Sequence, residues 1–288
     1  MIVGILSAMD GRLLFGRTVL AVCLFCAGCG GPDLDYKQAR HLDATGQFFR
    51  ALKEYENFLK KHPQDHRSVE VRYRAGLIYA RKLDRCREAV PLFEDAARDR
   101  ETANKEWVKL ARLGLLSCPD YFPLRDGTKW LYVDSLSLGK NMRLDVGIRK
   151  SSGGVSGLVS GKMFAGEQMI QWYKRSYDKQ GWAVYETIGE VKAPILKYPF
   201  QKGRKWDVRR GKVLETFEIV EAGAQVEVKA GTFENCLKVR RQTSGYPSWV
   251  YDYYCAGIGR VKTSVGVPGR ENPNTELAKV TFSAASKD

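Results

Sequence analysis

Few side chains in this chain of 288 residues could carry out acid–base or nucleophilic chemistry, and they are unevenly distributed. The three histidines, His41, His62 and His66, all precede the second half of the chain, so residues 121–288 contain no imidazole for a Ser-His-Asp or Cys-His site. His62 and His66 flank Asp65 and could bind a metal ion, but this spacing is more typical of a solvated loop. We therefore expect neither a metal nor a cofactor.

Carboxylate pairs offer a second kind of chemistry, because glycosidases place two acidic side chains around the bond that they cleave. Glu215 with Glu218 and Glu221 with Glu227 are candidate pairs. Their alternation along a predicted strand is more typical of side chains that face water. The sequence also lacks a Walker or dinucleotide-binding glycine loop. We expect that the protein is not an enzyme.

Cys236 and Cys255 are the cysteines whose spacing is most informative. A hairpin that pairs them turns between Gly245 and Tyr246, inside a Ser-Gly-Tyr-Pro run that favours a turn. The two side chains would then lie directly opposite each other, which predicts a disulfide in an oxidising compartment. A zinc site or a thiol catalyst is disfavoured, because the mature chain has no CxxC motif and no histidine near its cysteines.

The N-terminus contains an apolar run at residues 18–28 that follows Arg12 and Arg17. A basic start, a short apolar stretch and small residues at its end are typical of a secretory signal peptide. Translation from Met9 instead of Met1 would give a more conventional signal. We expect the signal peptide to be removed and the rest of the chain to be exported.

The run Cys-Ala-Gly-Cys that ends at Cys29 resembles the lipobox of bacterial lipoproteins. The resemblance implies that Cys29 is diacylated, for example with palmitate, becomes the new N-terminus and anchors the protein in a membrane. A Leu-Ala-Val-Cys run ending at Cys23 is a competing match, and an ordinary signal peptide with incidental cysteines is the alternative. Gly30 after the cysteine implies, by the enterobacterial sorting pattern, the outer membrane, with the protein facing the periplasm.

The segment before residue 120 has the apolar spacing of helices. Ala51 and Tyr55 recur 38 residues later as Ala89 and Phe93, and self-similarity at such a period indicates stacked helical pairs. The pattern resembles the tetratricopeptide repeat, although its signature Trp is absent. A fifth helix at residues 103–117 would cover the last apolar face of the stack.

The tetratricopeptide resemblance also implies a second disulfide. In such a stack Cys86, at the start of one helix, and Cys118, at the end of the next, lie on the same side and can pair. Each of the two bridges would add roughly 3 to 4 kcal/mol of stability. The repeats would either present a concave groove to a partner segment or act as a spacer, and the sequence favours neither.

After residue 120 the period of the apolar residues changes from 3.6 to 2, as Leu144, Val146 and Ile148 show. Similar runs, separated by turn residues, recur to the C-terminus and predict about ten to twelve strands and no helix. The expected fold class is α+β, with tetratricopeptide-like helical hairpins followed by an all-β antiparallel curved sheet or partly closed barrel. The expected domains are a signal peptide at 1–28, the helical domain at 29–120 and the β-domain at 121–288.

Three sequences in the β-domain resemble those of an uncharacterised β-domain of bacterial envelope proteins. They are the pattern FPL..G..W.Y at residues 122–132, the pattern V.AGTF.N at 228–235 and the pattern Y.PG.G.V at 254–261, where Ala256 replaces the proline. The glycines suit tight turns and Trp130 suits a core, so the resemblance implies a fold and no activity.

The formal net charge is +14, and residues 121–288 contribute 27 Lys and Arg against 17 Asp and Glu. The densest basic stretch is residues 202–212, where Trp206 lies among the cations. In a cytosolic protein this composition would suggest nucleic acid as a partner, but export argues against it. Anionic lipid headgroups or a cell-wall polymer are more suitable partners for an exported basic face, unless the charge only keeps the protein soluble.

Three functional hypotheses follow from these features. The favoured one is a non-enzymatic lipoprotein of the bacterial cell envelope that acts as an interaction scaffold or assembly factor for envelope proteins. The alternative is a carrier that binds a lipid or acyl chain on the curved sheet. The third is a cell-wall hydrolase or transferase that uses two carboxylates in one cleft.

Overall fold

The computed structural model describes residues 31–100 and 102–283. Contacts divide the chain into two compact units, one that ends at Ser68 and one that begins at Val69, and each is described separately here. The expected domain boundaries after residues 28 and 120 stay predictions, and the first of them lies outside the described residues.

The first unit contains two helices, α2 (Pro32–Ala44) and α3 (Phe48–Lys61), which pack against each other. Pro32 opens α2 and two acidic residues occupy its first turn, an arrangement that suits the positive end of a helix. A Gly at position 46, with a φ of 76°, turns the chain between the helices. The residues buried between them follow the helical spacing of the sequence: Ala39, Leu42, Ala51, Tyr55 and Phe58.

The second unit begins with three helices, α4 (Ser68–Lys82), α5 (Cys86–Ala97) and α6 (Lys105–Leu115). Phe93 of α5 is fully buried, and its ring lies against Gly76 and Gly114. A Cβ atom at either glycine would lie within 2.8 Å of that ring. The absence of side chains at these two positions therefore makes room for the ring.

The five helices confirm the helical segment and the fifth helix that the sequence predicts. Ala89 and Phe93 are buried in the helical core of the second unit, as their spacing predicts. The assembly of these helices into tetratricopeptide-like hairpins stays a prediction.

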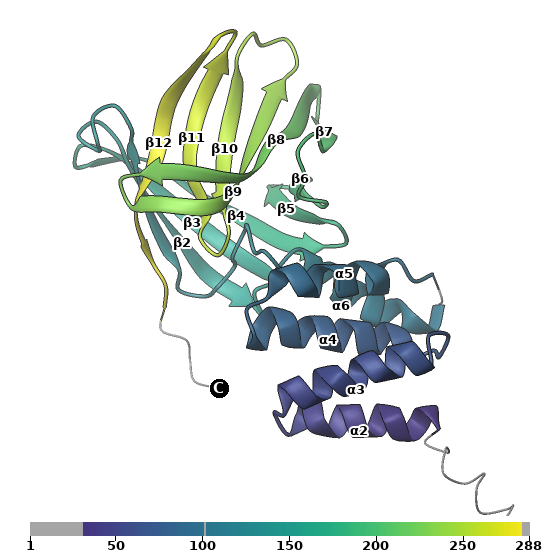
Figure 1. Cartoon of the computed structure of the whole chain (residues 1–288). Coiled ribbons are helices and arrows are strands. Elements are labelled where there is room, and N and C mark those ends of the chain that lie inside the picture. The colour runs from purple at the N-terminus through teal and green to yellow at the C-terminus, as the bar shows by residue number, and fades with distance from the viewer. Residues whose placement is uncertain (1–30, 101, 284–288) are drawn as a thin grey trace, which may run out of the picture. The chain divides into compact units, whose positions relative to one another are not determined.

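Twelve strands form one antiparallel sheet in the order β6-β5-β4-β3-β2-β1-β12-β11-β10-β9-β8-β7 (Figure 1). The strands are β1 (Lys129–Asp134), β2 (Arg143–Ser152), β3 (Ser156–Ala165), β4 (Gln168–Gln180), β5 (Ala183–Ile188), β6 (Val191–Lys197), β7 (Lys205–Arg210), β8 (Val213–Val228), β9 (Gly231–Thr243), β10 (Trp249–Cys255), β11 (Gly259–Val267) and β12 (Arg270–Thr281). Every strand pairs with its neighbours in sequence except that β6 and β7 do not pair with each other, and β1 also pairs with β12. The α+β class and the number of strands agree with the prediction.

The sheet is strongly curved, and its two edge strands, β6 and β7, are neighbours in sequence (Figure 1). They form no ladder with each other. Instead, the indole of Trp206 on β7 donates a hydrogen bond of 3.1 Å to the carbonyl oxygen of Pro194 on β6. Pro194 suits an edge strand because it has no N–H to pair. The predicted curved sheet is thus confirmed, and it is nearly closed.

None of the described helices combines the length and apolarity that a membrane span requires. Within residues 31–100 and 102–283, no three His, Cys, Asp or Glu side chains gather in a metal-binding arrangement. Asp65, which could have joined His62 and His66 around a metal, instead receives hydrogen bonds from Arg67.

Candidate binding site

The three sequences that resemble an uncharacterised envelope β-domain, residues 122–132, 228–235 and 254–261, are called the recurrent sequences below. Hydrogen bonds hold them close together. The indole of Trp130 donates a hydrogen bond of 2.8 Å to the carbonyl oxygen of Ile258, and the hydroxyl of Tyr132 donates one of 2.7 Å to that of Arg260. The backbone N–H of Gly257 bonds the carbonyl oxygen of Asp120 at 2.7 Å. The first two bonds join the first sequence to the third, and the last joins the third to Asp120, two residues before the first sequence.

A cavity of about 130 Å³ lies where the first and third of these sequences meet, on the inner face of the sheet. Phe122, Leu124, Trp130, Tyr132 and Tyr254 supply part of its wall. The same wall also carries six charged residues: Arg175, Glu186, Arg210, Arg241, Asp252 and Arg260. The interior of the sheet is therefore charged at this point, although the sequence predicts an apolar core.

Glu186 is the centre of one half of this charged network. Arg175 donates a hydrogen bond of 2.7 Å to its Oε1, and Arg210 donates one of 3.3 Å to its Oε2. The Tyr177 hydroxyl donates a further bond of 2.8 Å to Oε1. Arg210 also bonds Glu215 at 3.1 Å. Glu186 is 7% exposed, so these partners replace the water that its charge would otherwise need.

Arg241 and Arg260 form the other half, and their ion pairs are longer. Arg241 lies 3.6 Å from Glu215, and Arg260 lies 3.4 Å from Asp252. A charge-assisted N–H···O bond is typically about 2.7–2.9 Å long. Both guanidinium groups therefore keep donors that the network does not fully use. Four arginines share three carboxylates in this network, which leaves an excess of one positive charge.

The ionisation states of the network follow from these contacts. Burial raises the pKa of the Glu186 carboxyl, but the charges and hydrogen bonds of Arg175, Tyr177 and Arg210 outweigh it and hold that pKa below its ordinary value. Burial raises the pKa of the Tyr254 hydroxyl well above its ordinary value. Burial opposes the charge of Arg260, but the Asp252 carboxylate and the neighbouring tyrosines together outweigh it and raise the pKa of the guanidinium. The site thus contains ionised Glu186, charged Arg260 and neutral Tyr254 at neutral pH.

These ionisation states bear on the carboxylate-based hydrolase. Glu186 and Asp252 do line one cavity. A general acid holds its proton at working pH, whereas the contacts of Arg175, Tyr177 and Arg210 favour the ionised form of Glu186 and lower its pKa. An apolar acyl chain would strip water from the charges of this cavity without replacing its hydrogen bonds.

The interpretation of Glu215 as a side chain facing water is wrong. Glu215 is 8% exposed and points to the same face as Phe217 and Ile219. The reason is that Arg210 and Arg241 from the neighbouring strands supply the charges that its burial requires. Glu221 and Glu227 are exposed, as predicted.

The basic stretch at residues 202–212 is divided by the alternation of β7. Lys205 and Arg209 are exposed, whereas Arg210 turns inward beside Trp206. The ring of Trp206 stacks on Phe217 with ring centroids 5.3 Å apart. This stretch therefore supplies only part of its charge to the surface, and its Trp belongs to the core.

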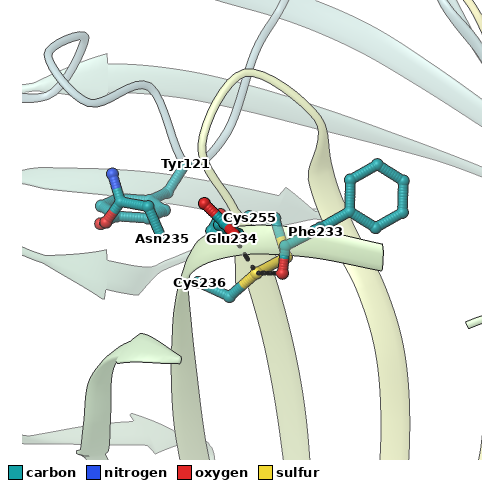
Figure 2. Close-up of a disulfide and its surroundings, with 6 residues drawn as sticks. All are labelled: Tyr121, Phe233, Glu234, Asn235, Cys236 and Cys255. Atoms are coloured by element: carbon teal, nitrogen blue, oxygen red, sulfur yellow. Dashed lines mark hydrogen bonds between the residues drawn. A yellow bond between two sulfur atoms is a disulfide. The ribbon is translucent and has the colours of Figure 1, made fainter. Parts of the chain in front are cut away.

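The structure contains the disulfide between Cys236 and Cys255 (Figure 2). The register confirms the hairpin prediction, with Cys236 opposite Cys255 and Lys238 opposite Tyr253. The Cys236 sulfur lies 3.5 Å from the Phe233 carbonyl oxygen. Because an oxidised sulfur has no hydrogen to donate, this is a close contact and not a hydrogen bond.

Asn235, beside this disulfide, explains the asparagine in the second recurrent sequence. It has a φ of 52° in an irregular part of β9, a conformation that Asn tolerates better than most residues. Its side-chain oxygen accepts a hydrogen bond of 2.8 Å from the Tyr121 hydroxyl (Figure 2). The second recurrent sequence is thereby tied to the segment that precedes the first.

The second disulfide, between Cys86 and Cys118, is also present and joins the start of α5 to the residues after α6. Cys29, the predicted site of lipidation, lies outside the described residues. The four cysteines beyond Cys29 that the sequence singled out thus form two separate disulfides, and neither disulfide lines the cavity.

A second feature with binding potential is the hairpin of β3 and β4. β4 pairs with β3 from Gln168 to Asp178, but with β5 only from Ser176 onward. Among the described strands, none pairs with the other edge of residues 168–175. Met169, Ile170 and Trp172 on this segment are each more than half exposed. Lys174 lies over the Trp172 ring, 5.1 Å from its centroid.

Sequence reasoning missed the charged residues of the cavity. A signal was available, because each occupies an inward position in the alternation of an otherwise apolar strand. Arg241 is in phase with Val239 and Leu237, and Arg210 is in phase with Val208 and Trp206. Acidic and basic residues at such positions on several strands indicate a charged interior.

The comparisons with known proteins give little further information. No family model and no curated protein matches the chain. It resembles the structure of a predicted exported protein with a YmcC-like fold from Bacteroides fragilis, with 12% identity, a TM-score of 0.43 and coverage of 56% of this chain and 98% of that one. It also resembles a predicted lipoprotein from Parabacteroides distasonis, with 11% identity, a TM-score of 0.38 and the same coverage. Such low TM-scores support no argument about function.

Proposed function

We propose that this protein is a non-enzymatic lipoprotein of the bacterial cell envelope that docks other envelope proteins. Acyl chains on Cys29 hold it at the outer membrane, facing the periplasm, after residues 1–28 are removed. Two disulfides support this proposal, because such bonds persist in oxidising compartments and are rare in the cytosol.

The observation that carries the docking function is the unpaired edge of β4. Residues 168–175 expose backbone N–H and C=O groups together with apolar side chains, and such an edge readily accepts an added strand. Lys162 on β3 lies opposite Trp172 on β4. Lys162 and Lys174 add positive charge to the face of the hairpin that carries Trp172. The partner that suits this hairpin is an extended segment that combines apolar and acidic side chains.

The helices provide a second docking surface if they stack as tetratricopeptide-like hairpins. In that arrangement α2 with α3 and α4 with α5 form two repeats, and α6 covers the end. Their groove would hold a second segment of the same partner or assembly.

An anionic partner fits the same face of the sheet, because Lys162, which lies opposite Trp172, also lines a groove there. Lys129, Arg149, Lys162 and Lys279 line a groove that has only Asp145 as an acidic residue. This arrangement suits a lipid headgroup or a cell-wall polymer with repeated negative charges.

Site-specific photo-crosslinking in intact cells tests the docking function. A crosslinking amino acid replaces Trp172, and a matched variant carries it at Tyr246, another exposed aromatic residue on a different hairpin. We expect covalent adducts with a defined envelope protein from position 172 only. Equal adducts from both positions, or none from position 172, would contradict the proposal.

The anchor needs its own experiment. Cells labelled with radioactive palmitate should yield a labelled wild-type chain and an unlabelled Cys29→Ser variant. A Cys23→Ser variant serves as the control, since it should keep its label. Label that is retained in Cys29→Ser and lost in Cys23→Ser would move the anchor to the competing cysteine.

A further inference from the structure

The cavity inside the curved sheet has a feature that the docking function does not use, namely its surplus of positive charge. Four arginines share three carboxylates, and two of those arginines, Arg241 and Arg260, make only long ion pairs. A positive charge in a partly enclosed cavity attracts anions, and it is stabilised when an anion occupies the space beside it.

Tyr254 is a further polar group of the cavity wall. Its side chain lines the cavity and is 6% exposed. Tyr254 lies opposite Arg260 in the register of β10 and β11, so the two side chains project from the same face of the sheet. A tyrosine hydroxyl can donate a hydrogen bond to an anion that occupies the cavity.

The size and access of the cavity limit what can occupy it. Its volume of about 130 Å³ is below the range of roughly 300–1,000 Å³ typical of pockets for drug-sized ligands. The side chains of Arg175, Arg241 and Arg260 are each more than a third exposed, so a solute can reach them from water. The occupant is therefore a small group, or the charged end of a longer molecule.

We propose that this cavity binds a small oxyanion, either a carboxylate or a phosphate or sulfate group, through the guanidinium groups of Arg241 and Arg260 and the hydroxyl of Tyr254. The planar guanidinium suits such oxygens because it donates two parallel hydrogen bonds to them. Glu186 bonds both Arg175 and Arg210, and it thereby holds Arg175 and Arg210 in place at the cavity wall. The proposed anion ligands lie on β9, β10 and β11, whereas the docking edge lies on β4, whose Tyr173 and Arg175 also line the cavity; anion binding does not require docking at that edge.

Calorimetric titration of the full-length lipidated protein in non-ionic detergent tests this site. Sodium acetate, phosphate and sulfate are titrated separately, and each replaces chloride at constant ionic strength. At least one should bind saturably. Acetate alone would assign a planar carboxylate, and phosphate or sulfate alone would assign a tetrahedral oxyanion.

Three variants identify the site. Arg241→Gln removes a charged donor and should weaken binding by about tenfold or more, and Tyr254→Phe removes only a hydroxyl and should weaken it by roughly three- to tenfold. Arg209→Gln, which changes the exposed neighbour of Arg210, should bind as the wild type does. Tyr254→Phe keeps the buried ring, so it stays informative if Arg241→Gln does not fold.

Three results would overturn the proposal. They are no saturable binding of any of the three anions by the wild type, unchanged affinity in Tyr254→Phe, and equal weakening in Arg209→Gln, which would indicate only a general attraction to the positive surface.

Discussion

The helical core around Phe93 and the cavity end of the sheet achieve burial in opposite ways. Phe93 is held by apolar neighbours and by two glycines that leave space for its ring. The sheet instead encloses Arg, Glu and Asp side chains that pair around a solvent-accessible space and leave one positive charge in excess. Close packing gives the first region its stability. The second region is less closely packed, and its arginines keep hydrogen-bond donors available for a ligand.

The largest expected effect is in the helical core. Phe93→Ala removes a fully buried ring and should lower the free energy of unfolding by about 3–5 kcal/mol. Denaturant unfolding followed by tryptophan fluorescence measures this change. Phe93→Leu, which keeps most of the apolar volume, is the control and should cost clearly less. A similar cost for both variants would mean that tight packing does not hold this core.

A smaller loss is expected at the cavity. Glu186→Ala leaves Arg175 and Arg210 without their shared carboxylate and should cost roughly 2–3 kcal/mol, below the value for a fully buried pair because solvent reaches both arginines. The same unfolding experiment compares it with Glu190→Ala, an exposed residue on the next turn, which should change little. If Glu186→Ala were as stable as wild type, the charged network would not contribute to the fold.

Gly114→Ala tests the fit of the helical core from the other direction. Alanine favours a helix by up to about 1 kcal/mol over glycine. Its Cβ, however, would lie 2.8 Å from the buried Phe93 ring. Because overpacking typically costs about 1–3 kcal/mol, we expect a net destabilisation of about 1 kcal/mol. A thermal melt with the exposed Lys109→Ala as control detects it, and a stabilised Gly114→Ala would show that the ring moves freely.

The smallest effect concerns pH. Since the pKa of Glu186 is lower in the folded protein than in the unfolded chain, its ionised form stabilises the fold above the ordinary pKa, and this contribution is lost as the pH falls through the folded value. The stability difference between wild type and Glu186→Gln should therefore shrink as the pH falls below the ordinary pKa of a glutamate, about 4.3. Unfolding curves at several pH values measure it, and a constant difference would assign the effect to packing instead.

Local sequence patterns predicted much of the fold, because helices and hairpins are specified by nearby residues. The pairing of Cys236 with Cys255 depended only on a turn signal and a count of residues. The pairing of β1 with β12 and the approach of β6 to β7 could not be predicted this way, since they join distant parts of the chain. The cavity depends on those long-range pairings, so its arginines were identified only in three dimensions.

The seam between β6 and β7 has a mechanical consequence. All other neighbouring strands are joined by ladders of backbone hydrogen bonds, whereas side chains bridge this opening: the Trp206 indole bonds Pro194 on β6, and Arg210 on β7 bonds Glu186 on β5. The short link after β6 keeps the two edges close even when these bonds break. The distance between the two edges of the sheet is therefore set along this line by side chains and not by a backbone ladder, so substitutions at Trp206 or Arg210 act on the closure of the sheet without changing its strand order.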